Sequence, residues 1–103
     1  MNQRLDPVIH APTRLSIMAL LVGATEAEFS TVRDSVGISD SVLSRQASAL
    51  EAAGYVKIRK GYVGKRPRTW LSLTTVGRDA FDAHVAALQR IVEQAGATLT
   101  PQT

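Results

Sequence analysis

The chain has 103 residues, with 12 lysines and arginines, nine aspartates and glutamates, and no cysteine. This length fits one small domain, and the lack of cysteine excludes disulfide frameworks, thiolate zinc sites and cysteine nucleophiles. The longest apolar run, from Ile17 to Ala24, is too short to span a membrane.

Arg4 and Arg14 precede the apolar stretch 15–24, an arrangement that loosely imitates a secretory signal. We expect instead that this stretch is the first core helix, because its removal would leave too little core for a domain of this size. A cytoplasmic protein is therefore expected.

The first elements begin at two prolines. Asp6-Pro7 is typical of a helix start, since Asp caps the first turn and Pro fits the first helical position. Pro12 indicates a break and a second start. The helix that follows is expected to end at Gly23, and its apolar stripe comprises Leu15, Met18, Leu21 and Val22.

Two short helices joined by a tight turn follow. Ser30 is a candidate N-cap for a helix over 31–36, and Gly37-Ile38-Ser39 is the turn, with Ser39 capping the next helix. That helix is expected from about 40 to 53, ending at Gly54, with an apolar stripe of Leu43, Ala47, Leu50 and Ala53. The pattern is that of a helix-turn-helix.

After Gly54 the apolar period changes to two, which predicts a hairpin. Strands are expected around 56–59 and 70–73, with a loop marked by Gly61, Gly64 and Pro67. Every charged residue between Tyr55 and Trp70 is basic, namely Lys57, Arg59, Lys60, Lys65, Arg66 and Arg68, whereas the rest of the chain has six basic and nine acidic residues. Such asymmetry favours a phosphate-binding surface. The alternative is a solvated hairpin whose charges prevent edge aggregation.

A final helix of about twenty residues, 75–95, is predicted after the capping Thr74. Its apolar residues Phe81, Val85, Leu88, Val92 and Ala95 alternate at spacings of four and three, as in a coiled-coil seam. The seam either covers the chain's own first helix or pairs with a second copy. A helix of ~30 Å exceeds what one small domain covers, so we expect a dimer completed by Leu5, Val8 and Ile9. The domain is expected to occupy residues 1–97, with 98–103 as a frayed polar tail.

The third helix and the hairpin carry the candidate functional residues. Ser41, Ser44, Arg45 and Ser48 fall on one helical face opposite the apolar stripe. Short hydroxyl side chains let a helix enter a DNA major groove, where Arg reads guanine or binds phosphate. The expected DNA-contacting set is Ser39, Asp40, Ser41, Ser44, Arg45, Ser48, Lys60, Tyr62, Lys65, Arg66 and Arg68. An ordinary solvent-facing stripe would more often carry Glu and Lys.

Other chemistry has little support in the sequence. His10 and His84 are interpreted as surface histidines, since His84 shares no helix face with Asp79 or Asp82, and no metal or cofactor is expected. Trp70 either helps the hairpin dock or covers the start of the last helix, and packing is favoured; Tyr55 is expected to pack locally. No serine has the His and carboxylate neighbours of a nucleophile, so no enzyme is expected.

At this point the chain resembles a known family. Residues 29–56, from Phe29-Ser-Thr to Gly-Tyr-Val56, resemble the helix-turn-helix of bacterial winged-helix regulators, and Gly64-Lys-Arg-Pro-Arg-Thr-Trp-Leu-Ser-Leu-Thr-Thr-Val-Gly-Arg78 resembles their wing and dimerisation helix. The similarity is greatest to compact single-domain regulators allied to the MarR and ArsR families, and it covers about residues 5–92. The resemblance implies a dimeric transcription regulator with residues 39–48 in a major groove and Lys65, Arg66 and Arg68 on the wing.

The sequence therefore predicts an α+β, mainly α, winged helix-turn-helix with a two-stranded wing hairpin and a long C-terminal dimerisation helix. The expected function is sequence-specific binding of double-stranded DNA at a pseudo-palindromic operator, by a nucleoid-associated homodimer that acts as a repressor. The alternative is a protein-interaction module that binds DNA only non-specifically.

Overall fold

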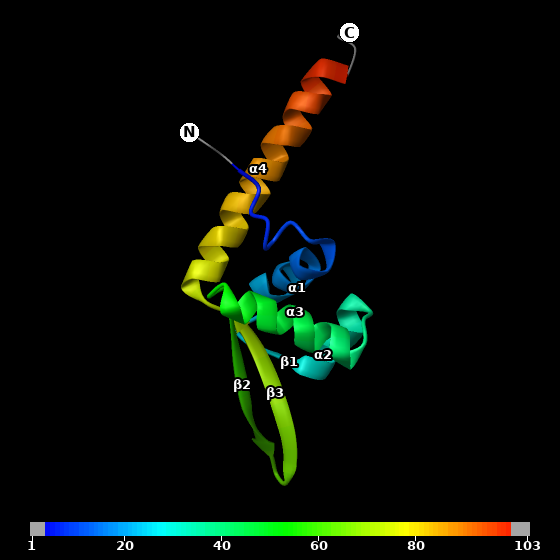
Figure 1. Ribbon diagram of the computed structural model, residues 1–103, viewed down its shortest axis with the longest axis vertical. Helices are drawn as coiled ribbons and strands as arrows, with labels where there is room; N and C mark the ends of the chain where they lie inside the picture. The colour runs from blue at the N-terminus through cyan, green and yellow to red at the C-terminus, as the bar shows by residue number, and fades with distance from the viewer. Residues whose placement is uncertain (1–3, 100–103) are drawn as a thin grey trace.

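The computed structural model describes the backbone of residues 4–99 and the side chains of residues 4–96. The elements in chain order are α1 (Pro12–Val22), β1 (Ala27–Glu28), α2 (Phe29–Val36), α3 (Asp40–Ala52), β2 (Val56–Val63), β3 (Arg66–Leu73) and α4 (Thr75–Leu99). Figure 1 shows a helical body from which the β2–β3 hairpin projects in one direction and α4 in the other. The mainly helical fold with a long last helix confirms the predicted class.

The core lies where α1, α2 and α3 meet the inner face of the sheet. Its fully or almost fully buried apolar residues are Ile9, Ile17, Met18, Leu21, Val32, Leu43, Ala47, Leu50, Val56 and Leu71. The predicted stripe of α3 is confirmed at Leu43, Ala47 and Leu50, which are at most 1% exposed. Burial of this stripe leaves the opposite face of α3 in solvent, because residues on opposite sides of a helix cannot share one surface.

The sheet has three antiparallel strands in the order β1-β3-β2. Sequence analysis predicted only the hairpin; the two-residue β1 pairs with β3 through Ala27–Leu71 and Glu28–Trp70. The loop between β2 and β3 is also shorter than predicted, because the two strands pair out to Val63–Arg66. Gly64 forms the turn with a φ of 62°, a conformation that favours glycine. The wing is therefore a long paired hairpin with a tight tip.

Most helix caps lie at the positions that the sequence predicts. Gly37 ends α2 in the left-handed region with φ 80°, and the Ser39 hydroxyl accepts a hydrogen bond from the Val42 N–H at 3.2 Å. Two predicted starts are wrong. Ser30 lies inside α2, whose N-cap is Glu28. Asp6 begins only a turn, in which its Oδ1 accepts from the Val8 N–H at 2.9 Å.

The base of α4 is joined tightly to the end of α3 and the start of β2. Thr74 caps α4 as predicted, since its Oγ1 accepts from the Gly77 N–H at 2.9 Å, and it also donates to the Gly54 carbonyl at 2.6 Å. Gly77 packs directly on this connection: a Cβ built there would lie 2.1 Å from the Tyr55 carbonyl oxygen. Only a residue without a side chain fits this contact.

The segment before α1 is fixed by a polar cluster at α4. The prediction that His84 is a surface residue is wrong, because His84 is only 1% exposed. Its Nδ1 accepts a hydrogen bond from the Asp6 N–H at 3.0 Å. The Tyr55 hydroxyl donates to Asp6 Oδ2 at 2.5 Å, so Tyr55 reaches well beyond its local surroundings. The blue segment beside α4 in Figure 1 is held by these contacts.

The far end of α4 also differs from the prediction. The helix runs four residues beyond the predicted end at Ala95, so Thr98 and Leu99 are helical rather than part of a tail. The remainder of the predicted tail, residues 100–103, lies outside the described residues, as do residues 1–3 of the predicted domain. Between residues 4 and 99 no helix has both the length and the apolar character that a membrane crossing requires.

Candidate nucleic-acid interface

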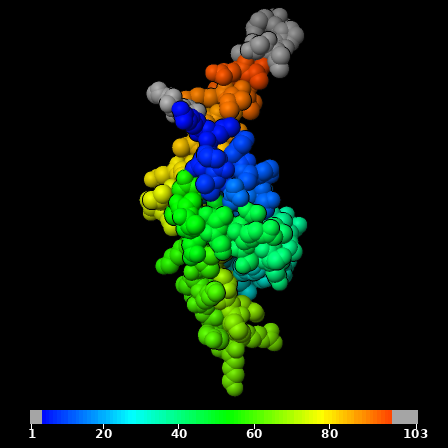
Figure 2. Space-filling model, viewed as in Figure 1, coloured from blue at the N-terminus to red at the C-terminus, as the bar shows by residue number. Residues whose placement is uncertain are grey.

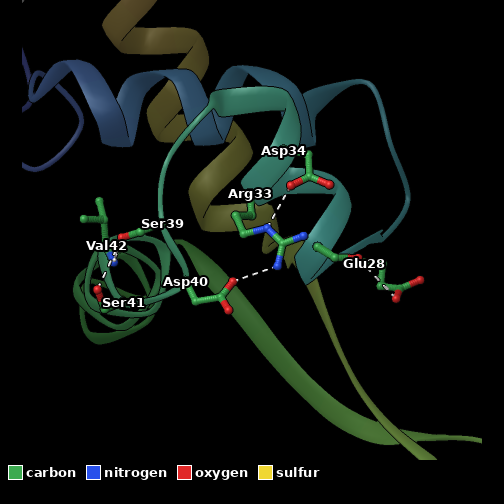
Figure 3. Close-up of polar contacts among 8 residues, drawn as sticks. Glu28, Arg33, Asp34, Ser39, Asp40, Ser41 and Val42 are labelled. Carbon is green, nitrogen blue, oxygen red and sulfur yellow. Dashed lines mark hydrogen bonds and ion pairs between the residues drawn. The ribbon is translucent and has the colours of Figure 1, made fainter.

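An ion-pair cluster joins α2 to the first turn of α3. The Arg33 guanidinium on α2 lies between Asp34, at 2.8 Å, and Asp40 in the first turn of α3, at 2.9 Å (Figure 3). These hydrogen bonds raise the pKa of Arg33, and Arg33 lowers the pKa of the Asp34 carboxyl. Asp40, in the predicted DNA-contacting set, is therefore engaged within the chain, and Arg33 offsets its negative charge at the start of α3.

The outer face of α3 presents the polar stripe that the sequence predicted. Ser41, Ser44, Arg45 and Ser48 are all exposed. Ser39 is also exposed, but its hydroxyl is occupied with the cap and lies 3.3 Å from the Ser41 hydroxyl. The side chains left without a described partner along this face are therefore the hydroxyls of Ser44 and Ser48 and the guanidinium of Arg45.

The strand register divides the basic residues of the wing between two faces. Side chains alternate across a strand, so Lys60 and Tyr62 share the inner face with Ile58, whereas Arg59 and Arg68 share the outer face with Trp70. Lys60 accordingly lines a groove of about 670 Å³ between α3 and the sheet, with Ser44, Ser48 and Thr69. This groove places a wing cation beside the serine stripe.

Two of the six basic residues are paired, which corrects the prediction that the wing charges are uncompensated. Arg59 contacts both Glu26 carboxylate oxygens at 2.8 Å, and Arg68 Nε lies 3.0 Å from Glu28 Oε1. Glu26 and Glu28 flank or belong to β1, and sequence reasoning missed them because it missed that strand. No signal in the sequence indicates these two partners, because a strand of two residues has no periodicity of its own.

Trp70 contacts its neighbours within the wing. The Arg59 guanidinium lies 4.1 Å from the centre of the Trp70 ring, a cation–π contact. Sequence analysis favoured packing of Trp70 over the start of the last helix and did not predict the contact with Arg59. Among the described side chains Lys60, Lys65 and Arg66 have no ion-pair partner, and with the exposed Tyr62 they occupy the hairpin towards its tip. Figure 2 shows this hairpin tapering away from the body, with long side chains projecting at its end.

The predicted dimerisation residues occupy very different environments. Ile9 has no exposed area because it lies in the chain's own core, so it has no surface to offer a partner. Leu5 and Val8 are half-buried, and Phe81 packs against the core. Val85, Leu88 and Val92 line a shallow groove of about 410 Å³ on α4, and Val92 is 66% exposed. Sequence analysis omitted Ile91, which is 49% exposed.

The rings of His10 and His84 are in contact and are tilted by 57° to each other. Their ring centroids are 5.4 Å apart, and burial together with the neighbouring His10 lowers the pKa of His84. Because His84 Nδ1 accepts from Asp6, the neutral ring carries its proton on Nε2, which is buried and has no hydrogen-bond partner in the described chain. No group of three metal-ligating side chains occurs among the described residues.

A helix-turn-helix followed by a basic hairpin and a long helix defines the winged-helix class of proteins. Residues 13–92 match the family described as winged helix DNA-binding domain, and the chain belongs to this family. Its fold is that of a winged-helix transcriptional regulator with a DNA-binding domain.

Solved structures support the same assignment. A transcriptional regulator homologue from Pyrococcus horikoshii OT3 is 26% identical, with a TM-score of 0.79 over 84% of this chain and 86% of that one. A MarR-family regulator from Silicibacter pomeroyi shares the fold at 22% identity and a TM-score of 0.65, over 92% and 63% of the two chains. The Mycobacterium tuberculosis regulator MOSR, solved in complex with DNA, has 19% identity and a TM-score of 0.70 over 93% and 68%. The predicted resemblance to MarR-like winged-helix regulators is confirmed.

Proposed function

We propose that this protein binds double-stranded DNA sequence-specifically as a homodimer and regulates transcription. The observation that carries the proposal is the groove between α3 and the wing, which combines the exposed Ser44 and Ser48 with the unpaired Lys60. Two further supports are the family membership and the DNA complex of a protein with the same fold.

The proposed docking mode places α3 in the major groove. A major groove about 12 Å wide admits one helix, and short serine side chains allow the backbone to approach the base edges closely. Arg45 is the long side chain on this face, suited to a guanine edge. Ser39 and Asp40, at the beginning of α3, would lie at the border of the contact, with the positive charge of Arg33 offsetting the negative charge of Asp40.

The wing would contribute affinity rather than sequence discrimination. Lys60, Lys65 and Arg66 have no ion-pair partner among the described residues, and contacts of such cations to phosphates do not depend on sequence. Tyr62, 72% exposed near the tip, would lie against the sugar-phosphate backbone or the minor groove.

A symmetric dimer follows from the part of α4 that the body leaves uncovered. This helix has 25 residues, and Val85, Leu88 and Val92 form an apolar groove along it, which we propose pairs with its copy. Leu5 and Val8 flank Asp6, which is bonded to His84 on α4, and we propose that they border this surface. A two-fold axis here implies two half-sites about one helical turn apart in a pseudo-palindromic operator. We infer repression, because a dimer across such a site blocks a promoter without further machinery.

The test of dimerisation is a substitution within the groove on α4. Val92→Glu would place a buried charge on each side of the two-fold axis, so the dimer dissociation constant should rise at least tenfold, about 1.4 kcal/mol. Sedimentation equilibrium measures it. Ala83→Glu, on an exposed position of α4 away from the groove, is the matched control and should leave the constant unchanged. A monomeric wild-type protein at high concentration would refute the dimer.

The test of DNA binding is fluorescence anisotropy on two duplexes, one from upstream of the protein's own gene and one of the same composition in shuffled order. Tighter, salt-sensitive binding to the native duplex supports a sequence-specific regulator. Equal binding to both duplexes contradicts recognition of that site.

A second candidate function is favoured by the apolar tip of the wing, where Tyr62 and Val63 are 72% and 56% exposed. Exposed apolar residues of this kind occur at protein-docking surfaces. Absence of DNA binding even at low salt would favour this protein-interaction module over the regulator.

A further inference from the structure

The two paired arginines of the wing are held to very different degrees. Arg59 makes two hydrogen bonds of 2.8 Å to Glu26 and stacks on Trp70. Arg68 has a single described contact, from Nε to Glu28 Oε1 at 3.0 Å. A guanidinium has five N–H donors, so once Glu28 no longer holds it, Arg68 has the hydrogen-bonding capacity to bind another anion.

Glu28 occupies a position that suits an anion. It is the last residue of β1 and the N-cap residue of α2, and its Oε1 also lies 3.4 Å from the Ser30 hydroxyl. Together with Ser30, Arg68 and Thr69 it lines a shallow groove of about 210 Å³ between the start of α2 and β3. The carboxylate thus sits beside a helix N-terminus, a hydroxyl and a guanidinium, which are the groups that bind a phosphate.

The pair is half-exposed, with side-chain exposures of 35% for Arg68 and 36% for Glu28. Ion pairs at this level of exposure contribute little net stability, because water screens them. The main effect of Glu28 is therefore on what Arg68 can bind, and its effect on the stability of the sheet is small.

We propose that Glu28 is a positioning residue that withholds Arg68 from DNA and thereby limits the affinity of the wing for phosphates. The proposal rests on the proposed DNA-binding function. Of the six basic residues of the wing, Arg59 is paired with Glu26 and Arg68 with Glu28, and the other four are available to DNA. Removing the charge of Glu28 frees the Arg68 guanidinium for one additional phosphate, whereas Arg59 stays on Trp70.

The experiment compares wild type, Glu28→Gln, Arg68→Ala and the double variant on one duplex by anisotropy between 50 and 200 mM salt. Each phosphate contact adds about 0.9 to the slope of log affinity against log salt. Glu28→Gln should steepen the slope by about this amount, so that the fourfold rise in salt costs about 3.5-fold more affinity than in wild type. Arg68→Ala alone should leave the wild-type slope unchanged, and the double variant should return to it.

Asp79→Asn, at an exposed position of α4 outside both the wing and the groove of Val85, Leu88 and Val92, removes one negative charge and should leave the slope at the wild-type value. A Glu28→Gln slope equal to wild type overturns the proposal and leaves DNA binding intact. An equal gain in affinity with and without Arg68 also overturns it, because Glu28 would then act only as a repelling charge. A wild-type protein that binds no duplex at low salt overturns both the proposal and the function on which it rests.

Discussion

The junction at the base of α4 and the surface formed by α3 and the wing use polar residues in opposite ways. At the junction, Asp6, Tyr55 and Thr74 each bond to a segment distant in sequence. On α3 and the wing, Ser44, Arg45 and Lys65 are exposed and have no described partner within the chain. Intramolecular pairing, rather than residue type, therefore distinguishes the polar groups that stabilise this fold from those that are available to bind a partner.

The largest effect is expected at the junction, from Gly77→Ala. The new Cβ would lie 2.1 Å from the Tyr55 carbonyl oxygen, so the backbone must separate at the base of α4. We expect a loss of about 3 kcal/mol or more in the free energy of unfolding, measured by urea denaturation. Gly96→Ala is the matched control within the same helix, because nothing lies within 4 Å of its Cβ; it should be neutral or stabilising by about 0.5–1 kcal/mol. Similar losses in both variants would contradict the role of close packing.

On the opposite surface, Arg45→Ala should change binding without changing folding. Loss of a base contact should reduce discrimination between operator and shuffled duplex by about 1–3 kcal/mol, measured by competition anisotropy. The unfolding free energy should stay within about 0.5 kcal/mol of wild type, as is usual for exposed positions. A variant that retains full discrimination would remove Arg45 from the proposed base contacts.

The junction should also make stability depend on pH through His84. Burial and the nearby His10 hold the pKa of folded His84 below its ordinary 6.5, although the Asp6 carboxylate opposes this shift. The unfolded chain then binds more protons, so the free energy of unfolding falls as pH decreases from about 7 through 6.5 towards the lowered pKa. The slope is at most about 1.4 kcal/mol per pH unit.

Urea denaturation between pH 5 and 8 measures this dependence. His84→Asn keeps an oxygen that can accept from the Asp6 N–H and does not titrate, so it should flatten the profile. His10→Asn should retain most of it, because the buried ring is still present. Identical profiles for His84→Asn and wild type would assign the pH dependence to other groups.

The hydrogen bond to Asp6 raises the pKa of Tyr55 in the folded protein. The free energy of unfolding should therefore also fall as pH rises above 10.

The smallest effect is expected at the tip of the wing. Lys65→Ala should weaken operator and shuffled duplex alike and reduce the salt slope by about 0.9, about 3.5-fold in affinity over a fourfold change in salt. Salt titrations of both duplexes measure it. Loss of discrimination in this variant, as large as that of Arg45→Ala, would contradict the division between helix and wing.

Local patterns were sufficient to predict much of the molecule. The turn at Gly37, the cap at Ser39 and the stripe of Leu43, Ala47 and Leu50 depend on neighbours within a few residues. β1 was not predictable in this way, because two residues carry no periodicity and exist as a strand only beside β3. The ion pairs of Arg59 and Arg68 were missed for the same reason. The burial of His84 was not predicted because a buried histidine needs a hydrogen-bond partner, and its partner is the backbone N–H of Asp6, which is distant in the sequence.

The hydrogen bond between Asp6 and His84 joins residues 78 positions apart, and this separation constrains the order of assembly during synthesis. At 5–20 residues per second, Asp6 waits about 4 to 16 s before His84 has been added. The helix-turn-helix, whose contacts are mostly local, can form within that interval. The segment before α1 can therefore bond to Tyr55 first, but it cannot complete its contacts until His84 on α4 has been synthesised.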